Sequence, residues 1–284
     1  DYWTQVIDIE LPPIVRFERQ GGGKEAIENA AKLLSKAKFP VILSGAGVVL
    51  GGAIDECKKL AEKLDAPVCN GYQHNDSFPG SHPLAVGPLG YNGSKAAMEL
   101  ISKADVVLAL GTRLNPFSTL PGYGIDYWPK KATIIQVDMN PDRIGLTKKV
   151  SVGICGDAKQ VAQQILDKLS SDAGNTGREE RKNLIHKTKS AWLQTLSGLD
   201  HEEDDPGTVW NKEARERDKD RMSPRQAWRA IQDALPQDAI ISSDIGNNCA
   251  IGNAYPTFEK PRKYLAPGLF LSLIHISEPT RPTD

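Results

Sequence analysis

The chain has 284 residues, of which 39% are hydrophobic and 25% are charged, and its formal net charge is −1 at pH 7. These values are typical of a soluble globular protein that forms one large domain or two ordinary ones. With no basic excess and no long apolar run, we expect neither a nucleic-acid partner nor a membrane partner.

The start of the chain and its cysteines bear on the compartment. No charged-then-apolar leader follows Asp1, so we expect no signal peptide. The cysteines are far apart and form no CxxC pair, which favours isolated thiols over a zinc site or a disulfide framework. They are Cys57, Cys69, Cys155 and Cys249. We therefore expect a reducing, cytoplasmic location.

Helical and strand patterns alternate from about residue 24. Apolar residues recur at helical spacing in 26–34, 54–64 and 94–104, and Asp157 is a candidate N-cap for a further helix that ends near residue 169. Nearly continuous apolar runs predict buried strands at 39–47 (running into a glycine turn), 66–71, 105–111, 132–138 and 150–155. Apolar strands that alternate with helices predict an α/β fold with a parallel sheet covered on both faces.

Ligands of such sheets bind beyond the carboxyl ends of the strands. This rule directs attention to 44–47, 70–74, 111–115 and 138–142. The run from Gly45 to Gly51 is near a dinucleotide-binding fingerprint, but its spacing has one residue too many. The second strand also lacks an acidic residue that could bind a ribose. We therefore predict a tight strand-to-helix turn here rather than an NAD site.

Two further features near strand ends allow more than one interpretation. Asp138 could accept ribose hydroxyl groups and Arg113 could pair with a phosphate, but Asp138 and Asn140 are also typical of a turn, which we favour. His74 and His82 lie in a Gly/Pro-rich segment, 72–93, that we interpret as a long and functional loop. No third ligand stands at a telling spacing, so we predict no metal site there.

The second half of the chain changes character. Residues 171–221 are polar and mixed in charge, with a hint of one helix near Trp192, and predict a solvated connector. Pro224 then fits the first position of a helix, and a strand follows at about 239–244. After this strand, the stretch from Asp244 to Asn248 offers a glycine for close backbone approach and amides that can donate to anionic oxygens. A diphosphate is a suitable ligand for it.

The motifs ALGTR (109–113), QVDMNPDRIG (136–145) and GDA (156–158), followed by SSDIGNNCAIG (242–252), resemble the thiamine-diphosphate-dependent enzymes of the acetolactate synthase type. By this resemblance, residues 1–13 are the tail of a pyrimidine-binding domain and 14–170 are a central, six-stranded α/β domain. Residues 171–221 are a charged connector, and 222–270 are the start of a second α/β domain that binds the diphosphate.

Residues 271–284 follow no turn or cap pattern. The stretch from Leu271 to Arg281 is similar to the translation of a transposon-end adapter used for sequencing libraries. We expect residues 271–284 to lie outside the fold.

The resemblance implies thiamine diphosphate and Mg²⁺ as cofactors. It places Ile245, Gly246, Asn247 and Asn248 against the diphosphate, although the family more widely has Gln-His in place of the two asparagines. The family's catalytic glutamate and its Gly-Asp-Gly metal segment have no counterpart in 1–284, and are expected before Asp1 and after Phe270. We thus expect no catalytic residue, no metal ligand and no activity from this chain alone.

The resemblance also indicates a reaction and an assembly. Segments 71–93 and 242–270 are most similar to members that convert sulfoacetaldehyde and phosphate to acetyl phosphate and sulfite. Because the family's cofactor lies between subunits, we expect a homo-oligomer, either a dimer or a tetramer. Some relatives carry FAD in the central domain, but we do not expect it, since this reaction has no redox step. The alternatives are a pyruvate carboligase such as acetolactate synthase, and a non-catalytic nucleotide- or flavin-binding module.

Overall fold

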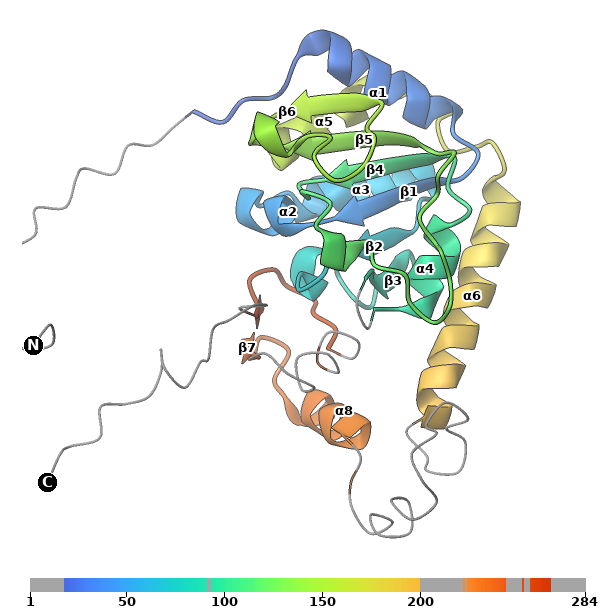
Figure 1. The fold of residues 1–284 in the computed structure, drawn as a ribbon, viewed down its shortest axis with the longest axis vertical. Coiled ribbons are helices and arrows are strands. Elements are labelled where there is room, and N and C mark those ends of the chain that lie inside the picture. Colours follow the sequence, from blue (N-terminus) through green and yellow to red (C-terminus); the bar gives the residue numbers. More distant parts are fainter. Residues whose placement is uncertain are drawn as a thin grey trace, which may run out of the picture.

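The computed structural model describes residues 18–90, 93–199, 222, 224–243, 252 and 256–266 of the chain. Its centre is a parallel sheet of six strands in the order β3-β2-β1-β4-β5-β6 (Figure 1). Strands β1 and β4 are buried along their whole length, as expected for central strands covered on both faces. The predicted α/β fold is therefore confirmed. The strands are β1 (Pro40–Ser44), β2 (Val68–Asn70), β3 (Ala85–Pro88), β4 (Val106–Leu110), β5 (Thr133–Asp138) and β6 (Val152–Cys155).

Strand β3 lies inside the segment that the sequence suggested was one long loop. It pairs with β2 at the edge of the sheet. Its Gly87 has a φ of +91° and its last residue is Pro88, and both residue types are poor strand formers. An edge strand tolerates them because only one of its sides needs backbone partners. The prediction of an uninterrupted loop over 72–93 is wrong for this reason.

The helices divide between the two faces of the sheet. The crossover through α3 (Ile54–Leu64) runs from β1 to β2, toward the β3 edge, whereas the crossover through α4 (Lys95–Ile101) runs back from β3 to β4. Since such crossovers are right-handed, α3 and α4 cover opposite faces. Helices α1 (Lys24–Lys36) and α5 (Ala158–Lys168) contact each other, and α5 also contacts α3. The predicted N-cap is confirmed, because the Asp157 carboxylate accepts two backbone N–H groups at the start of α5.

Helix α6 (Arg178–Leu199) occupies much of the region expected to be a connector, and it packs on α4 (Figure 1). Its anchor is Arg181, which is only 1% exposed. The guanidinium donates hydrogen bonds to five backbone carbonyl groups, those of Lys38, Leu64, Asp65, Gly174 and Thr176. Residues 178–199 therefore belong to the packed domain, while 200–221 lie outside the described residues.

In the described part of the second unit, α8 (Pro224–Ala234) is followed by two parallel strands, β7 (Ile241–Ser242) and β8 (Tyr264–Leu265). Pro224 opens its helix as expected. Residues 1–13 and 271–284 lie outside the described residues, so the expectations about them stay predictions.

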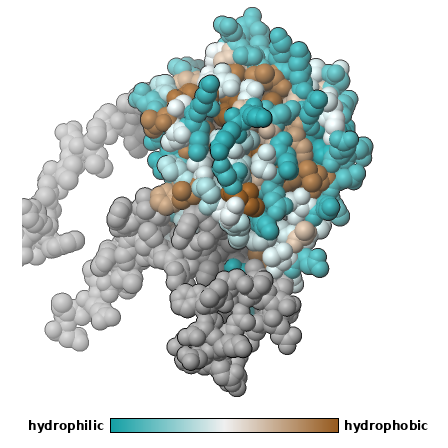
Figure 2. All heavy atoms as spheres, turned by 45° about the vertical axis from the view of Figure 1, so that its right-hand side comes forward, coloured by the Kyte–Doolittle hydropathy of each residue, from teal (hydrophilic) through white to brown (hydrophobic). Residues whose placement is uncertain are grey.

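The surface is mixed in character. On the face drawn in Figure 2, hydrophilic side chains are interspersed with scattered apolar ones. Within the described residues, no helix combines the length and the apolar character that crossing a membrane requires.

Candidate functional site at the carboxyl ends of the strands

A pocket of about 660 Å³ lies where the strand order reverses, between the carboxyl ends of β1 and β4. This is the position at which open parallel sheets bind their ligands. Residues from all four segments singled out in the sequence line it: Ala46 and Gly47, 71–74, 111–113 with Asn115, and Asp138 with Met139. The segments predicted to meet at the carboxyl ends of the strands therefore line one cavity.

The glycines after β1 and β4 allow two chain segments to cross in contact. The N–H of Gly47 donates to the Gly111 carbonyl oxygen over 2.8 Å. A Cβ atom at Gly47 would lie 2.7 Å from the Gly111 Cα atom, closer than such atoms approach. Gly111 itself has a φ of +61°, which favours glycine. These glycines thus serve the strand-to-helix turn that we predicted, in which α2 (Ala46–Gly51) starts two residues after β1.

The polar residues after β5 form the turn that the sequence favoured. One Asp138 carboxylate oxygen accepts the N–H of Asn140 over 2.9 Å, and the Asn140 side chain accepts the N–H of Asp142 over 3.0 Å. A short 3₁₀ helix, Pro141–Arg143, follows. These bonds satisfy donors of the turn itself, and they leave Asp138 on the wall of the pocket.

The pocket has a small excess of positive charge, since three arginines and two aspartates, Asp138 and Asp157, line it. Arg113 and Arg143 line the pocket and are exposed to solvent. Arg19 also lines it and forms an ion pair with Asp157 at 3.4 Å. His74 is partly buried there. Its burial lowers its pKa below the ordinary value, a change that nearby Asp76 opposes and Arg113 reinforces. Such a wall favours an anionic ligand such as a phosphate group.

The two histidines of segment 72–93 lie apart in the structure. His74 lines the pocket, whereas His82 contacts Glu62 at 3.3 Å on the outside of the domain. In the part of the chain that the structure describes, no group of three His, Cys, Asp or Glu residues could hold a metal ion.

The predicted diphosphate-binding residues, Ile245, Gly246, Asn247 and Asn248, lie outside the described residues. The last described residue before this segment is Ser243, whose N–H donates to the Leu265 carbonyl oxygen over 2.9 Å. The segment that follows therefore starts from the carboxyl end of two paired parallel strands. This is a suitable place for a ligand contact.

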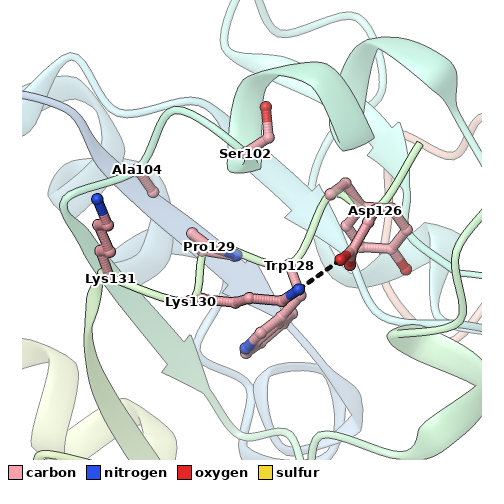
Figure 3. Close-up of a pocket in the computed structure, with 8 residues that line it drawn as sticks. Ser102, Ala104, Asp126, Trp128, Pro129, Lys130 and Lys131 are labelled. Atoms are coloured by element: carbon pink, nitrogen blue, oxygen red, sulfur yellow. Dashed lines mark hydrogen bonds and ion pairs between the residues drawn. The ribbon is translucent and has the colours of Figure 1, made fainter.

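A second hollow lies at the amino ends of β4 and β5. Figure 3 shows the residues that line it. It has a volume of about 270 Å³ and is bordered by Trp128 and by the ion pair of Asp126 and Lys130, whose charged atoms are 2.6 Å apart. The Lys148 ammonium lies 5.1 Å from the centre of the Trp128 ring. Asp126 and Lys130 pair with each other and are exposed, so the hollow is a weaker candidate.

Sequence reasoning missed part of the pocket. Arg19 and Gly156 line it with Asp157, yet only a helix cap was expected at Asp157 and nothing at Arg19. No local signal was present, because the contact arises where the chain before α1 packs beside the end of β6. There the N–H of Asp157 donates to the Gln20 carbonyl oxygen over 2.7 Å. That contact joins residues far apart in the sequence, which no local pattern reveals.

Comparison with known proteins identifies the domain. Residues 27–165 match the family model described as thiamine pyrophosphate enzyme, central domain. Over 270 residues the chain is 78% identical to a probable sulfoacetaldehyde acetyltransferase of Rhizobium meliloti (strain 1021), covering 95% of this chain and 46% of the relative. It is 76% identical over 270 residues to the sulfoacetaldehyde acetyltransferase of Roseovarius nubinhibens, covering 95% of this chain and 45% of the relative.

A more distant relative is a probable acetolactate synthase large subunit of Methanocaldococcus jannaschii. It is 30% identical over 275 residues, covering 92% of this chain and 43% of the relative. The chain thus spans about half the length of the curated relatives that it matches.

Proposed function

Because this chain belongs to the thiamine pyrophosphate enzymes and carries their central domain, we propose that it is part of a transferase that converts sulfoacetaldehyde and phosphate to acetyl phosphate and sulfite. The observation that carries the proposal is the gap in identity. Two relatives named for this activity share more than three quarters of the aligned residues, whereas the acetolactate synthase shares under a third.

The proposed reaction is redox-neutral and balanced. The carbon–sulfur bond of sulfoacetaldehyde breaks, sulfite leaves with the bonding electrons, and the remaining two-carbon unit is transferred to a phosphate oxygen as an acetyl group. Thiamine diphosphate supplies the carbon nucleophile and the electron sink for such a step. Mg²⁺ completes the proposed cofactor set, bound to the diphosphate through residues outside this chain.

Within this chain, the proposal assigns cofactor binding to Ile245, Gly246, Asn247 and Asn248. Gly246 would let the backbone approach the diphosphate, and the two asparagine amides would donate to its oxygens. The support is their place in the sequence shortly after β7, a strand that pairs in parallel with β8. Neither a catalytic residue nor a metal ligand is assigned to this chain.

The proposed assembly is a homo-oligomer, a dimer or tetramer, in the cytoplasm. The oligomer is proposed because the cofactor would be shared between subunits. The cytoplasmic location is supported by the cysteines in the described part, Cys57, Cys69 and Cys155, which are free thiols.

A chimeric enzyme tests the proposed reaction. In the Rhizobium meliloti relative, the 270 aligned residues would be replaced by those of this chain. We expect the chimera to release sulfite from sulfoacetaldehyde when thiamine diphosphate, Mg²⁺ and phosphate are present. Formation of acetolactate from pyruvate without sulfite release would instead support a carboligase. The 284-residue chain assayed by itself is the matched control and is expected to be inactive.

A non-catalytic nucleotide- or flavin-binding module is the second candidate, and one observation favours it. The pocket between β1 and β4 has a positive wall, formed in part by Arg113 and Arg143, that suits a phosphate group. Purified protein with a visible flavin spectrum would support this function. A colourless purified protein, together with an active chimera, would count against it.

A further inference from the structure

The loop that precedes β3 carries a contact surface for the second unit. The N–H of Gly80 donates to the Phe258 carbonyl oxygen over 2.9 Å, and the Asn75 side chain donates to the Pro256 carbonyl oxygen over 3.2 Å. At the exposed rim, Ser81 donates to both carboxylate oxygens of Glu259, at 2.9 and 2.7 Å. Residues 75–81 therefore bind the segment 256–264, which lies about 180 positions further along the chain.

Asp76 lies at the buried centre of this surface. It is 3% exposed, and its Oδ2 atom accepts the N–H of Lys263 at 3.0 Å and that of Tyr264 at 3.4 Å. The rings of Phe258 and Tyr264, themselves 6% and 5% exposed, pack against each other with centroids 5.4 Å apart. A buried carboxylate that accepts two neighbouring backbone N–H groups makes stronger hydrogen bonds than a neutral acceptor and fixes the chain at that point.

The two amides that Asp76 binds, those of Lys263 and Tyr264, stand where β8 begins. The Lys263 carbonyl oxygen accepts the N–H of Ile241 over 2.8 Å, and the Leu265 carbonyl oxygen accepts that of Ser243 over 2.9 Å. Asp76 thus holds the start of β8, and β8 holds β7 in register. Ser243, which is 6% exposed, ends this series of contacts directly before residues 244–248.

We propose that Asp76 of the central domain is a positioning residue that fixes strands β7 and β8, and so the point at which the chain leaves β7 at Ser243, relative to the central domain. This inference rests on the proposed function in one respect, since the segment after Ser243 is the one to which cofactor binding is assigned. Asp76 itself touches neither cofactor nor substrate in this proposal. It acts through the backbone of Lys263 and Tyr264.

Two variants and one control test this role. Asp76→Ala removes the acceptor, whereas Asp76→Asn keeps the shape of the side chain and one acceptor oxygen without the charge. Ser81→Ala is the control, because it removes one hydrogen bond from the exposed rim of the same surface. Hydrogen exchange of the amides of Lys263 and Tyr264, measured in the 284-residue chain, reports on the hydrogen bonds themselves and needs no cofactor.

We expect exchange at these amides to be about 10- to 100-fold faster in Asp76→Ala, with an intermediate change in Asp76→Asn and a change under about threefold in Ser81→Ala. Should Asp76→Ala fail to fold, Asp76→Asn carries the test. Exchange in Asp76→Asn equal to that of the parent chain, or an equally large change in Ser81→Ala, would overturn the proposal.

The same variants in the chimera separate this inference from the proposed function. We expect thiamine diphosphate to bind about tenfold more weakly to the Asp76→Ala chimera than to the parent chimera, with Ser81→Ala unchanged. Faster exchange with unaltered cofactor affinity would overturn the link to the segment after Ser243. The products of the parent chimera, which decide the reaction, would be unaffected by that outcome.

Discussion

Replacing Arg181 by methionine should strongly destabilise the domain. The guanidinium is buried and forms hydrogen bonds of 2.6–2.9 Å to five carbonyl oxygens. Two of these carbonyl groups, those of Leu64 and Asp65, lie at the carboxyl end of α3, where the helix offers them no N–H partner. Methionine is unbranched like arginine but shorter and has no donor, so it would leave all five without this partner.

The magnitude follows from opposing contributions. An unpaired buried carbonyl group costs at least about 1 kcal/mol, so five of them cost about 5 kcal/mol or more. In the parent chain, removing the guanidinium from water opposes part of this stabilisation. The same burial lowers the pKa of Arg181. We therefore expect the free energy of unfolding to fall by about 3–5 kcal/mol.

Urea denaturation followed by circular dichroism measures this change. Arg178→Met is the matched control in the same helical turn, because Arg178 forms a partly exposed ion pair with Asp65. That variant should lose only about 0–1 kcal/mol. Arg181→Lys should be intermediate, since an ammonium group has at most three donors. Equal stabilities for Arg181→Met and Arg178→Met would refute the assignment of Arg181 as the anchor of α6.

Three further predictions concern the pocket. Because burial lowers the pKa of His74, the folded state resists its protonation, so stability should decline as the pH falls below about 6.5 and His74→Gln should reduce that decline, as measured by melting temperature against pH. Gly47→Ala should destabilise the chain by about 1–3 kcal/mol through its clash with Gly111, whereas Gly23→Ala, which has open space around it, should change the urea midpoint little. Asp157→Ala removes the cap of α5 and should cost about 1–2 kcal/mol in the same measurement, and an unchanged midpoint would contradict the capping role.

Local patterns in the sequence were sufficient where structure depends on neighbouring residues. The predicted strand at 105–111 was visible because a central strand is apolar on both faces, and β4 indeed lies fully buried. The cap at Asp157 and the turn from Asp138 to Asn140 depend on residues two or three positions apart. Such features can be predicted because the partners stand next to each other in the chain.

Other features depend on partners that are distant in the sequence. Arg181 stands in a polar stretch that predicts a solvated connector, yet its acceptors come in part from Lys38 and from the end of α3. Asp76 likewise stands in a loop rich in Gly and Pro, and its donors lie 187 and 188 positions away. In both cases a charged residue is buried because backbone groups satisfy it, and composition does not show this.

The position of the pocket could be predicted from the sequence, but not all of the residues that line it. Parallel strands place their carboxyl ends at one edge, so the four segments that follow β1, β2, β4 and β5 could be expected to meet. Arg19 joins them only because the chain before α1 packs beside the end of β6.

The ratio of acetyl phosphate formed to sulfite released by the chimeric enzyme tests the proposed reaction most directly. Both products would be measured at early times with sulfoacetaldehyde and phosphate, with and without added thiamine diphosphate. The proposed reaction predicts a ratio of one, and neither product without the cofactor. Sulfite without acetyl phosphate, or acetolactate as the product with pyruvate, would contradict it.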